Sequence, residues 1–383
     1  MGLSVFDSPQ LKEGCDMTKK IRAIGTAVLV AVWVALTAFA WFAPAKETSE
    51  AERRPLAQFP ALSVDSLLAG EFVEDFESYT LDQFPGRDLF RQLKSLVHYN
   101  VLRQKDNNGI YIADGYAAKL DYPINEAALG HALERLNYVY ETYLAPNGSK
   151  VFASVIPDKG YYLAEQNGYP AMDYKALFQT VQEKMPWATH IDITDTLKAE
   201  DYYFTDTHWR QECLLGAAEK LCQAMGVAAP KAEDFTKTEL QRPFYGVYYG
   251  QAALPMDPET MYVMQSQLLE DCQVYNFETG KYSAVYDMDQ ITGKDLYNVF
   301  LSGPQSLLRI ENPNAKTDRE LIVFRDSFGS SVTPLLVQDY KTVTLVDIRY
   351  LDSRMLDKFL EFNGQDVLFL YSTLVLNAGT TLK

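Results

Sequence analysis

The sequence has little that would support a metal site, a disulfide framework or nucleic-acid binding. Only 4 histidines and 4 cysteines occur in 383 residues, and 51 acidic side chains outnumber 35 basic ones. The resulting net charge of -16 argues against nucleic-acid binding, because phosphate recognition needs clustered Lys and Arg. We find no internal repeat and no low-complexity tract. The 47% of hydrophobic residues is, however, ample for a large folded core.

The cysteines are predicted to be free thiols. Cys15 lies before a long apolar segment, and the other three lie after it. Cys213 and Cys222 are nine positions apart on one predicted helix, which places them on roughly opposite faces. Burial as small hydrophobic side chains is therefore favoured over a disulfide or a set of metal ligands.

Residues 23–45 form an uncharged, apolar segment. At 1.5 Å per residue such a helix can cross a hydrocarbon core of about 30 Å. Lys19, Lys20 and Arg22 crowd its N-terminal side, whereas Lys46 is the only comparably close basic residue on the other side. This asymmetry favours a single-pass membrane anchor with residues 1–22 in the cytoplasm and the C-terminal part outside the cell.

Two alternatives concern the N-terminal region. The sequence Ala43-Pro44-Ala45 resembles a signal-peptide cleavage site, although the apolar core of a signal peptide usually has about 7–15 residues. The length of the segment therefore favours an uncleaved anchor. Met17 precedes Thr-Lys-Lys-Ile-Arg and could be the true start of the chain.

The remainder divides into a linker, residues 46–70, and a folded domain, residues 71–383. Glu, Arg, Ser and Pro without apolar periodicity mark the linker, and Asp114-Gly115 marks an early hairpin. Helical and strand patterns then alternate, which predicts βαβ units and a mostly parallel sheet flanked by helices. The predicted strands are 151–156, 191–193, 321–324, 343–347 and 367–371. The predicted helices are 125–144, 173–185, 208–225, 330–340 and 353–362.

His208 is the histidine best placed for chemistry. His98, His131 and His190 occur without a polar cluster and are predicted to be structural. Asp206 and His208 are two positions apart in the run Asp206-Thr207-His208-Trp209. In an extended segment, residues two apart point the same way and are about 6.6 Å apart along the chain, so the carboxylate can reach the imidazole. A carboxylate in this position fixes the imidazole tautomer, while the start of the predicted helix at 208 would disfavour the imidazolium. A helix cap formed by Asp206 is the competing interpretation.

Ser327 occupies a predicted turn between a strand and a helix, in Arg325-Asp326-Ser327-Phe328-Gly329. Such a turn lifts a serine above the carboxyl edge of a parallel sheet and points backbone N–H groups toward a developing oxyanion. An ordinary Asp or Ser helix cap would produce the same local pattern. Together, however, the two segments supply a nucleophile, a base and an orienting carboxylate, which is the set that acyl transfer requires.

The sequence resembles the DHHW proteins and the related alginate O-acetylation proteins over most of the part beyond the apolar segment. The resemblance rests on these motifs: 82–88, 108–111, 203–209, 244–246, 325–329 and 346–350. It implies an SGNH-hydrolase-like, flavodoxin-like α/β fold, with Ser327 as nucleophile, His208 as base and Asp206 as its partner.

Two positions depart from the family pattern. Thr207 replaces the first histidine of the DHHW motif, as in the alginate-type relatives, and Arg325 replaces the usual glycine before Asp-Ser. The second oxyanion donor is open, with the Ser302-Gly303-Pro304 turn as one source. The candidates for oxyanion or substrate contacts are Gly303, Gly329, Arg349 and Trp209.

The resulting expectation is a membrane-anchored, extracytoplasmic acyl-ester enzyme that acts as an O-acetyltransferase or esterase on a cell-surface polysaccharide. The resemblance further implies a membrane-bound O-acyltransferase partner. No cofactor is expected, and a metal site using Asp206 and His208 lacks a third ligand at suitable spacing. The alternative is a catalytically inactive glycan-binding or assembly component, which the 25 tyrosines would also suit.

Overall fold

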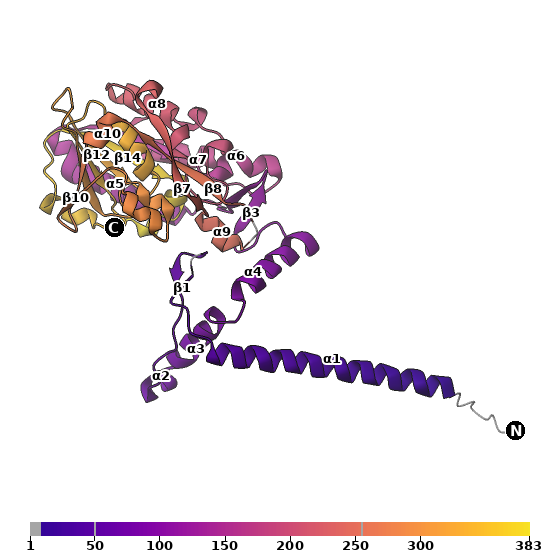
Figure 1. The fold of residues 1–383 in the computed structure, drawn as a ribbon. Coiled ribbons are helices and arrows are strands. Elements are labelled where there is room, and N and C mark those ends of the chain that lie inside the picture. Colours follow the sequence, from indigo (N-terminus) through magenta and orange to yellow (C-terminus); the bar gives the residue numbers. More distant parts are fainter. Residues whose placement is uncertain (1–8, 50, 254–255) are drawn as a thin grey trace. The chain divides into compact units, whose positions relative to one another are not determined.

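The computed structural model describes residues 9–49, 51–253 and 256–383. Contacts divide the chain into two units. The first contains the residues up to 50 together with Arg54–Leu93, and the second contains Ala51–Arg53 together with Lys94–Lys383. Residues 71–93, which we had grouped with the C-terminal domain, therefore belong to the first unit by their contacts. Figure 1 shows the elements of both units.

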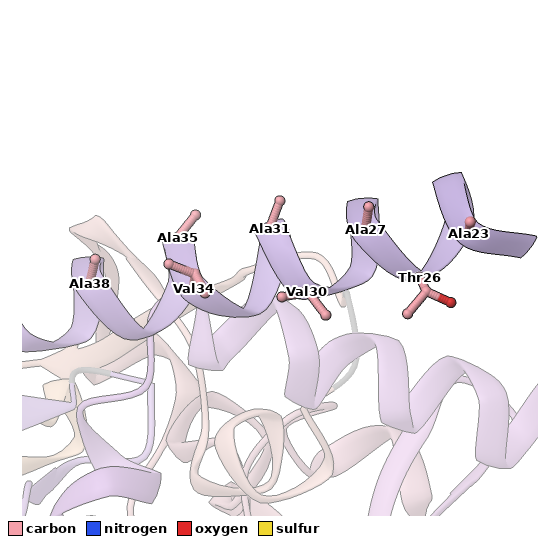
Figure 2. A pocket seen from close by; sticks show the side chains of 8 residues that line it. All are labelled: Ala23, Thr26, Ala27, Val30, Ala31, Val34, Ala35 and Ala38. Carbon is pink, nitrogen blue, oxygen red and sulfur yellow. The ribbon is translucent and has the colours of Figure 1, made fainter. Parts of the chain in front are cut away.

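The first unit begins with the long helix α1, Pro9–Phe42. Its part Lys19–Phe42 is long and apolar enough to cross a membrane, by length and composition. The helix ends before the predicted boundary at 45, because Pro44 cannot donate the next backbone hydrogen bond and constrains the residue before it. Figure 2 shows the small side chains along one side of this helix: Ala23, Ala27, Ala31, Ala35 and Ala38.

The rest of the first unit consists of short elements. Strands β1, Thr48–Ser49, and β2, Arg54–Pro55, pair antiparallel. Three helices follow: α2 (Val64–Ala69), α3 (Glu71–Asp82) and α4 (Arg87–Leu96), whose last three residues are grouped with the second unit. Ser63 caps α2 through the N–H of Ser66, and Gly70 ends it in the left-handed conformation that glycine adopts readily.

An eight-stranded sheet organises the second unit, in the order β10-β9-β11-β13-β12-β14-β5-β6. The four pairs from β13 to β6 are parallel and the three pairs from β10 to β13 are antiparallel. The bounds are β5 Lys150–Ile156, β6 Thr189–His190, β9 Gln273–Asn276, β10 Lys281–Ser283, β11 Leu307–Glu311, β12 Glu320–Arg325, β13 Thr342–Val346 and β14 Asp366–Ser372. The predicted α/β fold with a mostly parallel sheet is confirmed.

Helices cover both faces of this sheet (Figure 1). Along β12, Leu321 and Val323 belong to one hydrophobic cluster, and Ile322 and Phe324 belong to another. The first cluster includes α8 (Leu215–Met225) and the second includes α5 (Glu126–Val139) and α7 (Tyr174–Lys184). Apolar residues at consecutive positions are expected for a parallel strand that is buried on both faces.

Two hairpins and several short helices complete the unit. The hairpins are β3 (Ile110–Ala113) with β4 (Tyr116–Lys119), as predicted at Asp114-Gly115, and β7 (Thr236–Phe244) with β8 (Glu259–Gln265). The other α-helices are α6 (Lys159–Leu163), α9 (Val247–Ala252), α10 (Gln267–Asp271), α11 (Gly329–Val332) and α12 (Thr373–Asn377). Wider π-helical turns continue α4 over Val97–Val101 and α5 over Tyr140–Leu144. Short 3₁₀ turns occupy 145–147, 165–167, 194–196, 199–201, 211–213, 232–234, 288–292, 296–299, 333–336, 353–358 and 379–381.

Several predicted element bounds were wrong. The helix predicted from 208 begins at Leu215. The helices predicted at 330–340 and 353–362 are largely 3₁₀ turns, and Pro334 lies within the first of them, where it interrupts α-helical hydrogen bonding. The strand predicted at 191–193 is the edge strand β6 at Thr189–His190.

Candidate functional site

Ser327 lies in the turn immediately after β12, at the carboxyl edge of the parallel part of the sheet. The preceding Asp326 is fully buried and braces this turn on both sides. Its Oδ1 accepts the N–H of Phe328 at 3.0 Å, and its Oδ2 accepts the N–H of Ser372 at 2.8 Å and the hydroxyl of Ser372 at 2.6 Å. The serine therefore has a fixed backbone and a half-buried position.

Asp206 and His208 lie in a tight loop and not at the start of a helix. The N–H of Tyr203 donates to the carbonyl of His208 at 3.1 Å, and the N–H of Arg210 donates to the carbonyl of Asp201 at 2.7 Å. These bonds close residues 201–210 like a hairpin. The proposed effect of a helix dipole on His208 is therefore wrong, because α8 starts seven positions later.

The structure brings the three predicted side chains together. His208 Nδ1 lies 2.6 Å from Asp206 Oδ1, and His208 Nε2 lies 2.8 Å from Ser327 Oγ. An ionised carboxylate can only accept hydrogen bonds, so Nδ1 carries the proton in this arrangement. The lone pair of Nε2 then faces the hydroxyl of Ser327, as proton removal from that hydroxyl requires.

Asp206 is fully buried, yet its environment favours the charged form. Burial alone would raise the pKa of Asp206, but the His208 ring, Arg53 and the N–H of Val247 outweigh it and lower the pKa below its usual range. The N–H of Val247 donates to Oδ2 at 2.8 Å, and Arg53 Nη1 lies 3.5 Å from the same oxygen. Both oxygens of the carboxylate are thus engaged.

Distant parts of the chain hold the loop that carries Asp206. Glu259 accepts the N–H groups of Phe204 and Thr205 and the hydroxyl of Thr205 at 2.5–2.8 Å. Buried Lys159 donates from Nζ to the carbonyl of Tyr203 at 2.8 Å. Gly246 packs so closely that a Cβ there would overlap the Thr205 carbonyl group. The loop conformation depends on all of these contacts.

Tyr297 restrains the imidazole ring. The two rings are stacked with centroids 3.9 Å apart and planes inclined by 10°. Tyr297 is itself buried, and its hydroxyl donates to Ser331 Oγ at 2.8 Å. Phe328 adds a second, tilted ring at 5.0 Å from the imidazole. His208 therefore has little freedom to turn away from Ser327.

The backbone N–H groups around Ser327 differ in whether they are free to donate a hydrogen bond to an oxyanion. The N–H of Gly329 donates to the carbonyl of Asp326 at 3.1 Å, and the N–H of Gly303 donates to the carbonyl of Phe300 at 3.2 Å. Within the part of the chain that the structure describes, the N–H of Ser327 donates to no acceptor. The Ser327 amide is thus the better candidate for an oxyanion donor than either predicted glycine.

The other candidate contacts, Trp209 and Arg349, lie in different surroundings. Trp209 is fully buried and donates from Nε1 to the carbonyl of Phe328 at 3.1 Å and to Ser331 Oγ at 2.9 Å. Arg349 is engaged by Asp347 through two side-chain bonds of 2.9 and 2.6 Å. Trp209 thus supports the wall behind the site, and the guanidinium of Arg349 already has a carboxylate partner.

Arg325, at the position that is usually glycine, is fully buried behind the serine turn. Its Nη1 lies 3.8 Å from Asp347, and a Cβ on Gly329 would approach the Arg325 Cβ to 2.7 Å. The absence of a side chain at Gly329 thus makes room for Arg325, which gives Gly329 a steric role.

The remaining histidines and cysteines lie outside this arrangement. His131 and His190 each bond a backbone carbonyl at 2.9 Å, those of Leu382 and Met185. Cys213, Cys222 and Cys272 are free thiols. Cys222 and Cys272 are buried as predicted, whereas Cys213 is half-buried and lies in the 3₁₀ turn 211–213, outside the helix that carries Cys222. Among the described residues, no group of three or more His, Cys, Asp and Glu side chains is arranged to hold a metal ion.

Sequence reasoning missed several residues of the site. Arg53 had been assigned to the linker, and Tyr297, Glu259 and Lys159 belong to segments whose order in the sequence gives no sign that they meet the Asp206 loop. Only Gly246 had a signal, because it lies in the Phe-Tyr-Gly motif of the family resemblance.

Comparison with known proteins supports this reading of the fold. A family model described as DHHW protein matches residues 189–346, a stretch that contains Asp206, His208 and Ser327. Comparison with curated proteins found no match.

Two solved proteins have a similar fold. A DHHW family protein from Eubacterium siraeum DSM 15702 is 23% identical with a TM-score of 0.58, over 72% of this chain and 94% of that chain. Bacillus cereus PatB1, in a structure with a sulfonyl adduct, is 17% identical with a TM-score of 0.56, over 70% of this chain and 95% of that chain. The resemblance to the DHHW family that the sequence predicted is thus confirmed, by the family model over residues 189–346 and by the shared fold over most of the chain.

Proposed function

We propose that this protein is a membrane-anchored, SGNH-like acyl-ester enzyme in which Ser327 is the nucleophile, His208 the general base and Asp206 the orienting carboxylate. The single observation that carries this proposal is the chain of two short contacts, 2.6 Å from Asp206 to His208 and 2.8 Å from His208 to Ser327. Ser327 lies at the carboxyl edge of the parallel strands, where α/β enzymes place their sites, and His208 contacts it from the loop 201–210.

The chemistry follows from the positions of these atoms. Ser327 Oγ attacks the acyl carbonyl carbon while His208 Nε2 takes its proton, and the oxyanion is stabilised by the N–H of Ser327. The C–O bond to the leaving alcohol then breaks, and His208 returns the proton to that alcohol. A second hydroxyl, from a sugar or from water, reverses these steps on the acyl-serine and releases the enzyme.

The acceptor class and location complete the proposal. The DHHW-family resemblance implies transfer of an acetyl group to a cell-surface polysaccharide, with hydrolysis as the competing outcome when water reaches the acyl-serine. The Lys19–Phe42 segment, preceded by a basic N-terminal side, would anchor the enzyme with its second unit outside the cell. A membrane-bound O-acyltransferase is the partner that could supply acyl groups.

A membrane-impermeant fluorophosphonate probe on intact cells tests activity and orientation together. We expect the full-length protein to be labelled, and Ser327→Ala to abolish both labelling and hydrolysis of a small acetyl ester, by about 10³-fold or more. Ser283→Ala, at the end of edge strand β10, is the matched control and should keep full activity.

The other outcomes separate the alternatives. Labelling only after cell lysis would contradict the outward orientation. No labelling of the wild-type protein under either condition would favour a non-catalytic glycan-binding or assembly role. Full esterase activity in Ser327→Ala would overturn the assignment of the nucleophile.

A further inference from the structure

The short segment Ala51–Arg53 of the predicted linker belongs to the same unit as the site. Its neighbour Arg54 belongs to the other unit, where its guanidinium bonds Asp82 at 2.8 and 2.6 Å. Arg53 adopts a φ of 54°, a left-handed conformation that is costly for a residue with a side chain. Two adjacent arginines thus point to different partners, and the backbone between them is strained.

The side chain of Arg53 lies against the Asp206 loop and is only 12% exposed. Its Nη1 lies 2.7 Å from Asp295 Oδ2 and 3.5 Å from Asp206 Oδ2. Its Nη2 donates to the backbone carbonyl of Tyr245, and its guanidinium lies 5.3 Å from the centre of the Phe244 ring. One cation therefore bridges two carboxylates and the backbone just before Gly246.

The charges around this point explain why a cation is needed. Burial raises the pKa of Asp295, and the negative charge of Asp206 raises it further, whereas Arg53 acts in the opposite direction. The other charged groups that act on Asp206 are His208 and the ammonium of Lys159. Without Arg53, the fully buried carboxylate of Asp206 and the partly buried carboxylate of Asp295 would face each other with no cation between them, which is costly.

We propose that Arg53 is a positioning residue for the reaction, so that residues 51–53 of the predicted linker form part of the active site. It neutralises Asp295 and holds Asp206 Oδ2, which leaves Asp206 Oδ1 aligned on His208. Arg53 acts through Asp206 and does not itself contact the reacting atoms. This inference rests on the proposed function and adds a region outside the DHHW-matched stretch, residues 189–346.

The test compares four variants of the full-length protein by steady-state hydrolysis of a small acetyl ester. Arg53→Met should lower kcat about tenfold to hundredfold, with little change in KM, because orienting partners act on the chemical step. The acidic limb of its pH–rate profile should move to higher pH, since removal of a nearby cation favours the protonated imidazole. Arg53→Lys should recover part of kcat because the charge is restored.

The double variant Arg53→Met/Asp295→Asn provides the sharpest readout. If Arg53 offsets the charge of Asp295, removal of both charges should recover part of the kcat lost in Arg53→Met and move the acidic limb back. Arg54→Met is the matched control, because its guanidinium bonds Asp82 in the other unit, and it should keep wild-type kcat and pH dependence.

Two results would overturn the inference. In the first, Arg53→Met keeps wild-type kcat and an unchanged acidic limb. In the second, kcat falls equally in Arg53→Met, Arg53→Lys and the double variant with an unshifted acidic limb, which would mean that Arg53 only fastens the linker to the fold. Failure of the proposed function can be told apart from failure of the Arg53 inference, because the wild-type protein itself would then lack Ser327-dependent turnover.

Discussion

The turn that carries Ser327 follows β12 and is braced by the adjacent strand β14. In contrast, contacts from four separate segments hold the loop that carries Asp206 and His208: three are made by side chains and one by a backbone N–H. In the serine turn, Asp326 bonds both its own turn and Ser372 at the end of β14. In the loop, Arg53, Lys159, Val247 and Glu259 each contribute a contact from a different segment.

The difference indicates where the site is most vulnerable. A turn supported by paired strands has a geometry largely set by the sheet register, which is specified by the hydrophobic pattern. A loop supported by scattered side chains keeps its geometry only when each of them is in place. We therefore expect substitutions that disturb this loop to reduce activity more than global stability. Lys159 is the exception, because its buried amine also makes stability depend on pH.

The largest expected effect comes from Asp206 itself. Asp206→Asn should lower kcat for ester hydrolysis by about 10³- to 10⁴-fold, because an amide can donate to Nδ1 and favour the wrong imidazole tautomer. Thermal unfolding by circular dichroism should show that the fold is retained. A decrease below tenfold would mean that the imidazole does not depend on the loop carboxylate, and the comparison between the two segments would lose its basis.

A smaller but still large effect is expected from crowding the loop. Gly246→Ala would place a methyl group against the Thr205 carbonyl and the Asp206 backbone. A shift of the loop by about 1 Å should lower kcat roughly 10²-fold. Gly130→Ala on the exposed side of α5, where no atom lies within 4 Å, is the matched control and should raise stability by about 0.5–1 kcal/mol. Equal activities of the two variants would contradict the proposed tight packing.

Among these substitutions, Lys159→Met is expected to affect activity least. Its main effect is on how the stability of the protein depends on pH. Burial lowers the pKa of Lys159 from 10.5 to about 7, although Glu259 and Asp206 act in the opposite direction. Between these two values the unfolded chain binds a proton that the folded protein does not. The contribution of Lys159 to stability is therefore full above pH 10.5 and is lost progressively as the pH falls from 10.5 to about 7.

Lys159→Met should remove this dependence. Urea unfolding of the full-length protein at several pH values should show a stability that rises between pH 7 and 10 in the wild type and a flatter one in Lys159→Met, with each unit of pKa difference corresponding to about 1.4 kcal/mol. Lys175→Met, at an exposed position of α7, should behave like the wild type. An unchanged slope in Lys159→Met would show that Lys159 is not the source of the pH dependence.

The strands and the serine turn could be predicted from the sequence because their signals are local. Apolar runs at 321–324, 343–347 and 367–371 coincide closely with β12, β13 and β14, and the run Arg325–Gly329 marks the turn. Asp206 and His208 are two positions apart, so their proximity also required no knowledge of the fold.

Only the tertiary structure decided what surrounds these groups. The helix predicted at 208 is absent there because bonds from Tyr203 and Arg210 close the loop before α8 can begin, and such pairings carry no periodic signal. Arg53 is separated from Asp206 by more than 150 positions, and a charged residue in a polar linker has the same appearance whether it faces water or a buried carboxylate. Local chemistry in the sequence thus specified the reactive groups, whereas long-range packing and burial specified their supports.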